Sequence, residues 1–188
     1  MQRMSKFEKV SYDQFRKDWL NTFYEDPRDY IDQVTNEITL EIDCYIRRVY
    51  DGIELPKRAT MQSAAYDFYI PECFTLKAGD SIKIPTGIRC EMYDGWVLML
   101  YPRSGLGFKY GLGLANHTAL IDGDYCESDN EGHIFVKLVN DSSLAKDIKF
   151  KAGDAFCQGA FLQFGITLDD NVTAQRNGGL GSTDNGRR

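Results

Sequence analysis

From Pro56 onward, short apolar runs alternate with clusters of glycine, proline, asparagine and aspartate, a pattern typical of many short strands joined by turns. The runs that predict strands are residues 66–70, 81–84, 87–92, 96–101, 134–139, 148–150 and 155–164. Turn residues separate them, for example at 78–80, 94–95, 140–141 and 152–154. Such a series predicts a mainly β fold, a distorted jelly roll or β-barrel.

Residues 1–52 have a different pattern, which predicts a short helical N-terminal extension. Ser11 is a candidate N-cap for a helix whose apolar residues recur at helical spacing: Phe15, Trp19, Leu20 and Phe23. A second helix is predicted over residues 41–50, although residues 38–42 also alternate as a strand would. We expect Trp19 and Phe23 to pack on the β core or on a neighbouring subunit.

Composition excludes several classes of function. The net charge of −6 argues against a nucleic-acid groove, which requires basic residues to meet phosphates. The cysteines are odd in number and far apart, which indicates neither a disulfide framework nor a zinc site: Cys44, Cys73, Cys90, Cys126 and Cys157. Residues 1–12 are polar, and no apolar run reaches membrane-spanning length, so we expect a soluble cytoplasmic protein without membrane contact.

Two predicted bends carry residue types suited to triphosphate chemistry. Arg103, Ser104 and Gly105 follow a predicted strand and offer a guanidinium, a hydroxyl and a backbone that a ligand can approach closely. Asp122 and Tyr125 lie on the second bend and offer a carboxylate and a flat ring. A nucleotide hydrolase needs these parts, because phosphoryl transfer depends on positioned donors and an oriented water.

These bends are two of five islands that follow one another at residues 64–68, 102–107, 116–132, 153–159 and 176–183. In this order the islands resemble the five motifs of the trimeric dUTP diphosphatases (dUTPases). The resemblance covers residue 53 to the end, and implies a dUTPase-like β core at 53–170 and a flexible phosphate-lid arm at 171–188. It also implies a homotrimer with shared active sites that converts dUTP to dUMP and pyrophosphate with Mg²⁺.

The resemblance assigns catalytic roles to three residues: Asp122, Arg103 and Arg176. It implies that Asp122 activates the water that attacks the α-phosphorus, and that Arg176 acts on the γ-phosphate like an arginine finger. It further implies that Asp67 reaches Mg²⁺ through water. The implied substrate-binding residues are Ser104, Gly105, Asn116, Tyr125, Gln158, Leu180, Gly181, Ser182 and Thr183.

The residues alone leave other roles open. An aspartate followed by glycine, as at Asp122, is commonly a solvated turn residue. Gln158, in an apolar strand, could make a structural hydrogen bond instead of contacting phosphate, and Asp67 could pair with Arg103. Tyr125 could be a half-buried strand residue.

The chain also departs from the family pattern. Leu180 stands where most members have a phenylalanine that stacks on uracil, which predicts weaker closure over the base. Residues 126–131 form an insertion that we expect to be an exposed bulge. His117 and His133 are interpreted as strand-end or surface residues.

Two alternative functions share the expected scaffold. A dCTP deaminase requires a glutamate on the strand after Gly132, where this chain has Lys137. A regulatory or binding protein could use the N-terminal helices and the insertion, and would bind dUTP without releasing pyrophosphate.

Overall fold

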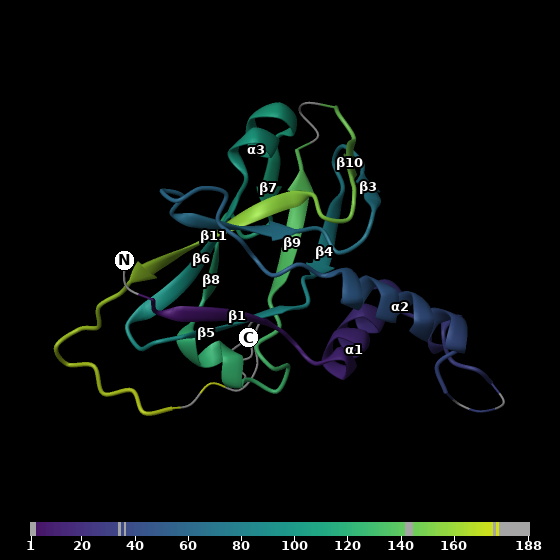
Figure 1. The fold of residues 1–188 in the computed structure, drawn as a ribbon, viewed down its shortest axis with the longest axis horizontal. Helices are drawn as coiled ribbons and strands as arrows, with labels where there is room; N and C mark the ends of the chain where they lie inside the picture. The colour runs from purple at the N-terminus through teal and green to yellow at the C-terminus, as the bar shows by residue number, and fades with distance from the viewer. Residues whose placement is uncertain (1–2, 34, 36, 142–144, 175, 177–188) are drawn as a thin grey trace.

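The computed structural model describes residues 3–33, 35, 37–141, 145–174 and 176. The fold is mainly β and jelly-roll-like, with two helices against one flank (Figure 1). The strands are β1 (Ser5–Lys9), β2 (Ala65–Tyr69), β3 (Phe74–Leu76), β4 (Ser81–Pro85), β5 (Ile88–Met92), β6 (Trp96–Pro102), β7 (Leu112–Leu114), β8 (Ala119–Ile121), β9 (Phe135–Asn140), β10 (Ile148–Phe150) and β11 (Ala155–Gln163). The helices are α1 (Tyr12–Phe23), α2 (Leu40–Gly52) and α3 (Ser104–Tyr110), with 3₁₀ turns η1 (Pro27–Asp29) and η2 (Gly123–Glu127).

The strands pair antiparallel in four sheets. The largest has the order β2-β11-β6-β8, and a second has the order β4-β9-β7. Two-stranded sheets join β1 to β5 and β10 to β3. The burial pattern of β9 shows why this segment forms a strand: Val136 and Leu138 are buried while Lys137 between them is exposed, as the two-residue period of a strand requires.

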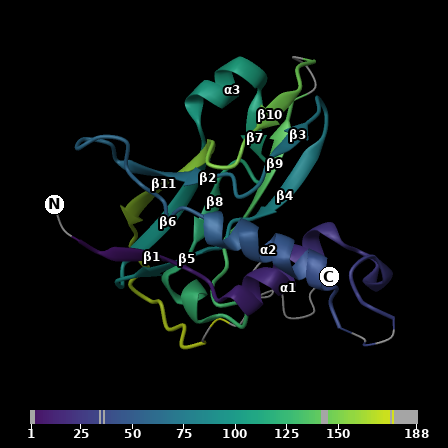
Figure 2. The same cartoon turned by 45° about the vertical axis from the view of Figure 1, so that its right-hand side comes forward.

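Helices α1 and α2 lie side by side along the β core, as both views show (Figures 1 and 2). The Ser11 side chain accepts a hydrogen bond from the Gln14 amide and caps α1, as its sequence predicts. Phe15 and Trp19 from α1 and Ile46 from α2 are buried in the common core, and the Phe15 ring contacts the Tyr50 ring of α2 at 5.5 Å between centroids. The N-terminal segment is therefore part of the hydrophobic core. Among the described residues, no helix is both long and apolar enough to cross a bilayer.

The two expected helices and the seven expected strands are confirmed, with boundaries shifted by one or two residues. Several elements were not predicted. Strand β1 lies in the polar N-terminus, where a single phenylalanine, Phe7, packs against the rings of Tyr66, Phe68 and Phe161. The expected bend after β6 is the helix α3, which ends at Gly111 in the left-handed conformation (φ 70°).

The insertion at residues 126–131 is not simply an exposed bulge, and this expectation is wrong in part. Glu127 and Asp129 are exposed, but Ser128 is buried. The Glu131 carboxylate accepts hydrogen bonds from the Ser11 amide (2.7 Å) and hydroxyl (2.6 Å). The insertion thus contacts the start of α1, because the N-terminus of a helix favours a carboxylate.

Candidate active site

Strand pairing brings three of the five islands together at one end of the large sheet. In the register of β2, β11 and β6, Asp67 lies opposite Gln158, and Gln158 lies opposite Tyr101. Arg103 follows the last residue of β6, so its side chain reaches this same corner. We call Asp67, Arg103, Ser104, Gly105 and Gln158 the phosphate-end cluster.

Arg103 is held at this corner by two acceptors. Its Nε lies 3.3 Å from Asp67 Oδ1, and its Nη1 donates to the Ala155 carbonyl at 3.5 Å. The side chain remains 42% exposed, which leaves guanidinium N–H groups available to a ligand. Ser104 and Gly105 begin α3 and are exposed. A cavity of about 530 Å³ opens beside them, lined also by Lys149.

Gln158 lies on β11, as expected, and its side-chain amide already makes a hydrogen bond within the chain. The Nε2 donates to the Pro102 carbonyl at 3.3 Å, so the structural hydrogen bond that the residue pattern allowed is present. One further N–H of the same amide remains for a ligand, because a glutamine amide carries two. Likewise, Asp67 forms an ion pair with Arg103, which is the alternative to a magnesium-binding role that the sequence left open.

The third island and Arg176 form a second cluster at the other end of β6. We call Asn116, Asp122, Tyr125 and Arg176 the nucleoside-end cluster. They line one cavity of about 110 Å³, together with Ala119, Leu120, Ile121 and Phe135. Its walls combine apolar side chains with a few polar groups, as is usual for a site that binds a small molecule.

Tyr125 is fixed in place by its hydroxyl. The ring is 7% exposed, and the hydroxyl donates to the His133 carbonyl at 2.7 Å and accepts from Asn130 Nδ2 at 2.8 Å. Burial raises the pKa of Tyr125, so the hydroxyl stays protonated and keeps donating at neutral pH. The ring therefore presents a stable wall to the cavity.

Arg176 pairs with two of the carboxylates of the third island. It forms an ion pair with Asp122, and its Nε lies 3.2 Å from Asp124 Oδ1. Its guanidinium carbon lies 6.0 Å from the centre of the Tyr125 ring. Leu180, Gly181, Ser182 and Thr183 lie outside the described residues.

The two clusters do not meet within one chain. Asp122 follows Ile121, which pairs with Leu98 near the start of β6, whereas Arg103 follows the end of β6. Asp122 therefore comes opposite Val97, six residues before Arg103, and at about 3.3 Å per residue the two positions are roughly 20 Å apart along the strand. Figures 1 and 2 agree: α3 lies at the top of the β core, and the green turn after β8 lies at the bottom.

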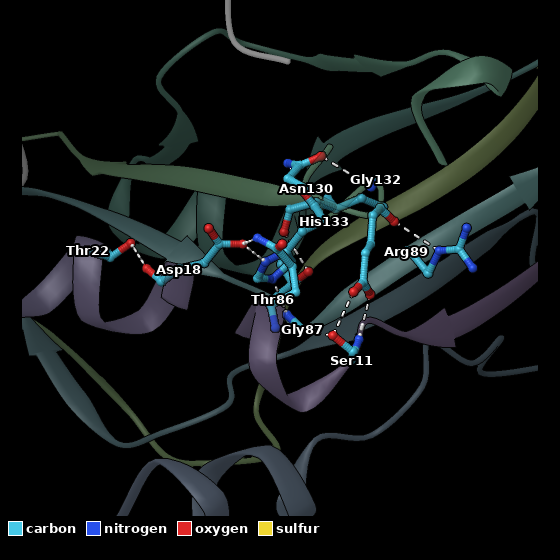
Figure 3. A network of polar contacts seen from close by, with 12 residues as sticks. Ser11, Asp18, Thr22, Thr86, Gly87, Arg89, Asn130, Gly132 and His133 are labelled. Carbon is cyan, nitrogen blue, oxygen red and sulfur yellow. Dashed lines mark hydrogen bonds and ion pairs between the residues drawn. The ribbon is translucent and has the colours of Figure 1, made fainter. Parts of the chain in front are cut away.

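A network of polar contacts around His133 was missed from the sequence (Figure 3). His133 is fully buried two residues before β9, so of its two predicted placements the surface one is wrong and the strand-end one holds, whereas His117 is exposed as expected. His133 Nδ1 lies 2.6 Å from Asp18 Oδ2 on α1. One signal was available, since Asp18 lies within the apolar stripe of α1 beside Phe15 and Trp19. A carboxylate on a buried helix face needs a partner.

The phosphate-end cluster offers too few ligands to enclose a metal ion by itself, but it could hold a magnesium ion that keeps most of its waters. In the part of the chain that the structure describes, no group of three or more acidic, histidine or cysteine side chains is placed to hold a metal. Asp67 is a single carboxylate with a side chain 17% exposed. Magnesium keeps several waters and commonly takes one or two carboxylates plus substrate phosphates, so this donor set fits it.

On this jelly-roll-like scaffold, the cavity beside Arg103 and the cavity lined by Asp122 and Tyr125 together offer a guanidinium, a carboxylate and an aromatic wall, the groups that a nucleoside triphosphate hydrolase uses. The sequence profile of the dUTPase family matches residues 51–184. The chain belongs to the dUTPase family, and it catalyses the hydrolysis of dUTP.

Relatives and solved structures agree with this family. The deoxyuridine 5'-triphosphate nucleotidohydrolase of Lactococcus lactis is 38% identical over 135 residues, which cover 70% of this chain and 89% of that protein. That of Dictyoglomus turgidum is 37% identical over 147 residues, covering 73% and 95%. The crystal structure of a Streptococcus mutans dUTPase superimposes with a TM-score of 0.57 at 30% identity, covering 86% of this chain and 97% of that one.

A dUTPase from Staphylococcus aureus phage phi11, whose structure coordinates a structural Mg(II) ion, is similar in fold alone. Its TM-score is 0.54 at 18% identity, covering 68% of this chain and 95% of that one.

Proposed function

We propose that Asp122 orients and activates the water that attacks the α-phosphorus of dUTP, releasing dUMP and pyrophosphate. The observation that supports this proposal is that Asp122 and Tyr125 line the same cavity, so a sugar packed on the Tyr125 ring would lie beside this carboxylate. An ionised carboxylate can accept a proton from water and hold it in line for displacement. The Arg176–Asp122 ion pair would open when phosphate oxygens compete for the guanidinium.

Tyr125 would select the deoxyribose. A buried ring held by two hydrogen bonds cannot move aside easily, so a ribose 2′-hydroxyl pressed against it would clash. Asn116 lies at the tight turn between β7 and β8, on the rim of the same cavity, and would contact the uracil edge.

Arg103, Ser104 and Gln158 would hold the triphosphate. The exposed guanidinium can fork to phosphate oxygens, the Ser104 hydroxyl can donate to the leaving pyrophosphate, and Gln158 has an amide N–H left to donate. Gly105 would let the backbone approach the phosphates. This arrangement stabilises charge on the leaving group.

Magnesium would be held by the triphosphate and, through water, by Asp67. The ion would supply charge neutralisation on the phosphates when it is bound. The Asp67–Arg103 pair would keep the carboxylate directed toward the same corner as the phosphate-binding groups.

The active site would be completed by neighbouring subunits of a homotrimer. The support is the separation of the two clusters along β6, because one substrate must touch both Asp122 and Arg103. A second support is the segment after β11, whose apolar residues are exposed on one chain: Phe164, Ile166, Leu168 and Val172. Another copy would cover such residues.

Residues 171–188 would act as the arm that closes over the phosphates, with Arg176 reaching the γ-phosphate. Leu180, Gly181, Ser182 and Thr183 would complete this lid through backbone and hydroxyl donors. We further propose a cytoplasmic location, which suits five cysteines that are all free.

The test is pyrophosphate release from dUTP, UTP, dTTP and dCTP, with Asp122→Asn measured alongside. We expect activity on dUTP only, and a loss of several orders of magnitude in the variant while dUTP binding remains. Full activity of Asp122→Asn would contradict the proposed base. Ammonia release from dCTP would instead identify a deaminase.

A further inference from the structure

We propose that Asp18, on the N-terminal helix α1, acts through His133 as a positioning residue for Tyr125 and thereby sets the discrimination between dUTP and UTP. The inference rests on the sugar-selecting role proposed above for Tyr125. Asp18 lies outside residues 51–184, the stretch that the dUTPase profile matches. The N-terminal segment would then contribute to specificity without touching substrate.

The first contact in the series from Asp18 to Tyr125 joins α1 to His133. Asp18 Oδ2 lies 2.6 Å from His133 Nδ1, with the histidine fully buried and the aspartate side chain 12% exposed. The Gly87 amide donates to His133 Nε2 at 2.7 Å, so that nitrogen is an acceptor and Nδ1 carries the proton. Gln14 donates to the same Asp18 oxygen at 2.7 Å. The imidazole is therefore held on both edges, by a helix and by a strand connection (Figure 3).

The second link joins His133 to the wall of the nucleoside cavity. The His133 carbonyl accepts the Tyr125 hydroxyl at 2.7 Å, and Asn130 completes the bonds to that hydroxyl. The His133 ring also packs on Phe135, 4.6 Å between centroids, and Phe135 lines the same cavity. A shift of His133 would thus move two walls of the site at once.

A separate contact fixes the segment between Tyr125 and His133. The Ser11 amide and hydroxyl hold the Glu131 carboxylate, and Arg89 donates to the carbonyls of Glu131 and Cys126 at 2.9 Å each. Helix α1 therefore touches this segment through both Ser11 and Asp18. Since rotation of the Tyr125 ring changes the room for a 2′-hydroxyl, loosening α1 should relax sugar discrimination.

The experiment compares the ratio of kcat/KM for dUTP to kcat/KM for UTP in the full-length protein. Asp18→Ala should lower this ratio about tenfold, because small misplacements of a positioning group have effects of this size or larger. Asp18→Asn keeps an oxygen acceptor near His133 and should restore part of the loss. The matched control is Asp13→Ala on the same helix, whose side chain is 86% exposed and pairs with Arg16, and its ratio should equal that of the wild type.

A double-mutant cycle separates positioning from stability. A Tyr125→Phe background lacks the hydroxyl that binds the His133 carbonyl, so Asp18→Ala should lower the ratio much less there, through the His133–Phe135 contact alone. Equal losses in both backgrounds, or an unchanged ratio with a lower melting temperature, would overturn the inference and leave the proposed function intact. If Asp18→Ala does not fold, the same cycle is run with Asp18→Asn, where about a threefold loss is expected.

A wild-type protein that hydrolyses UTP as efficiently as dUTP would overturn the role of Tyr125 itself, and this inference with it.

Discussion

Gly132 connects the insertion to β9, and its replacement by alanine should disturb the segment that holds Tyr125. Its φ of 71° lies in the left-handed region, and an added Cβ would stand 2.5 Å from Cys126 Cα and 2.8 Å from the Tyr125 carbonyl oxygen. Both neighbours are backbone atoms, so no flexible side chain can move aside. Gly132→Ala must therefore shift the insertion relative to β9.

The expected loss of unfolding free energy in Gly132→Ala has two parts, which a control variant can separate. The left-handed conformation costs an alanine about 1–2 kcal/mol, and overpacking against backbone adds about 1–3 kcal/mol. Gly95 has a similar φ of 79°, with nothing within 4 Å of an added Cβ. Gly95→Ala should therefore lose only the conformational part, while Gly132→Ala should lose about 2–5 kcal/mol in total.

The assay is urea unfolding of both variants and the wild type, monitored by circular dichroism, with kinetics on dUTP at a temperature where all three are folded. We expect Gly132→Ala to show the larger loss of unfolding free energy and a raised KM for dUTP. Equal stability losses in the two variants would refute the argument that Gly132 is confined by the insertion.

Three further predictions concern the core, pH and the lid. Phe15→Ala should destabilise the protein by about 3–5 kcal/mol in thermal or urea unfolding, because Phe15 is fully buried between α1 and the β core. Phe23→Ala, at a residue 40% exposed, should lose far less, and equal losses would contradict the docking of α1. Burial raises the pKa of Cys90 from 9.0 to about 12, so stability that is present below pH 9 is lost as pH rises toward 12. Unfolding at pH 8 and pH 10 should differ by about 1.4 kcal/mol from this thiol, and Cys90→Ala should show a correspondingly smaller difference. Leu180→Phe should lower KM for dUTP by adding a ring that stacks on uracil, and an unchanged KM in steady-state kinetics would count against that role.

Local sequence signals predicted the elements that depend on local spacing. Helix α1 follows from an N-cap at Ser11 and four apolar residues at helical intervals, and β9 follows from its two-residue alternation. Strand β1 could not be predicted in this way. It pairs with β5, far away in the chain, and has Phe7 as its one large apolar residue.

In the candidate site, too, the features with a local sequence signal were predicted and those that depend on distant residues were not. The five islands identified the functional residue types, and the sequence alone left open whether Asp67 pairs with Arg103. The position of Asp18 within the apolar stripe of α1 signals that its carboxylate needs a partner, but the partner, His133, is 115 positions later in the chain, so no local pattern identifies it. The separation of Asp122 from Arg103 depends on the register of β6 and β8, which a sequence pattern does not specify.

Subunit complementation tests most directly whether Asp122 of one chain serves the phosphates bound by Arg103 of another. Asp122→Asn and Arg103→Ala chains, each inactive alone, are unfolded together, refolded as an equal mixture and assayed for pyrophosphate release from dUTP. Composite sites predict recovery of about a quarter of wild-type activity, because the two halves of each site are drawn independently from the mixture. A mixture as inactive as either variant alone would show that both residues must belong to one chain, and would contradict the shared site.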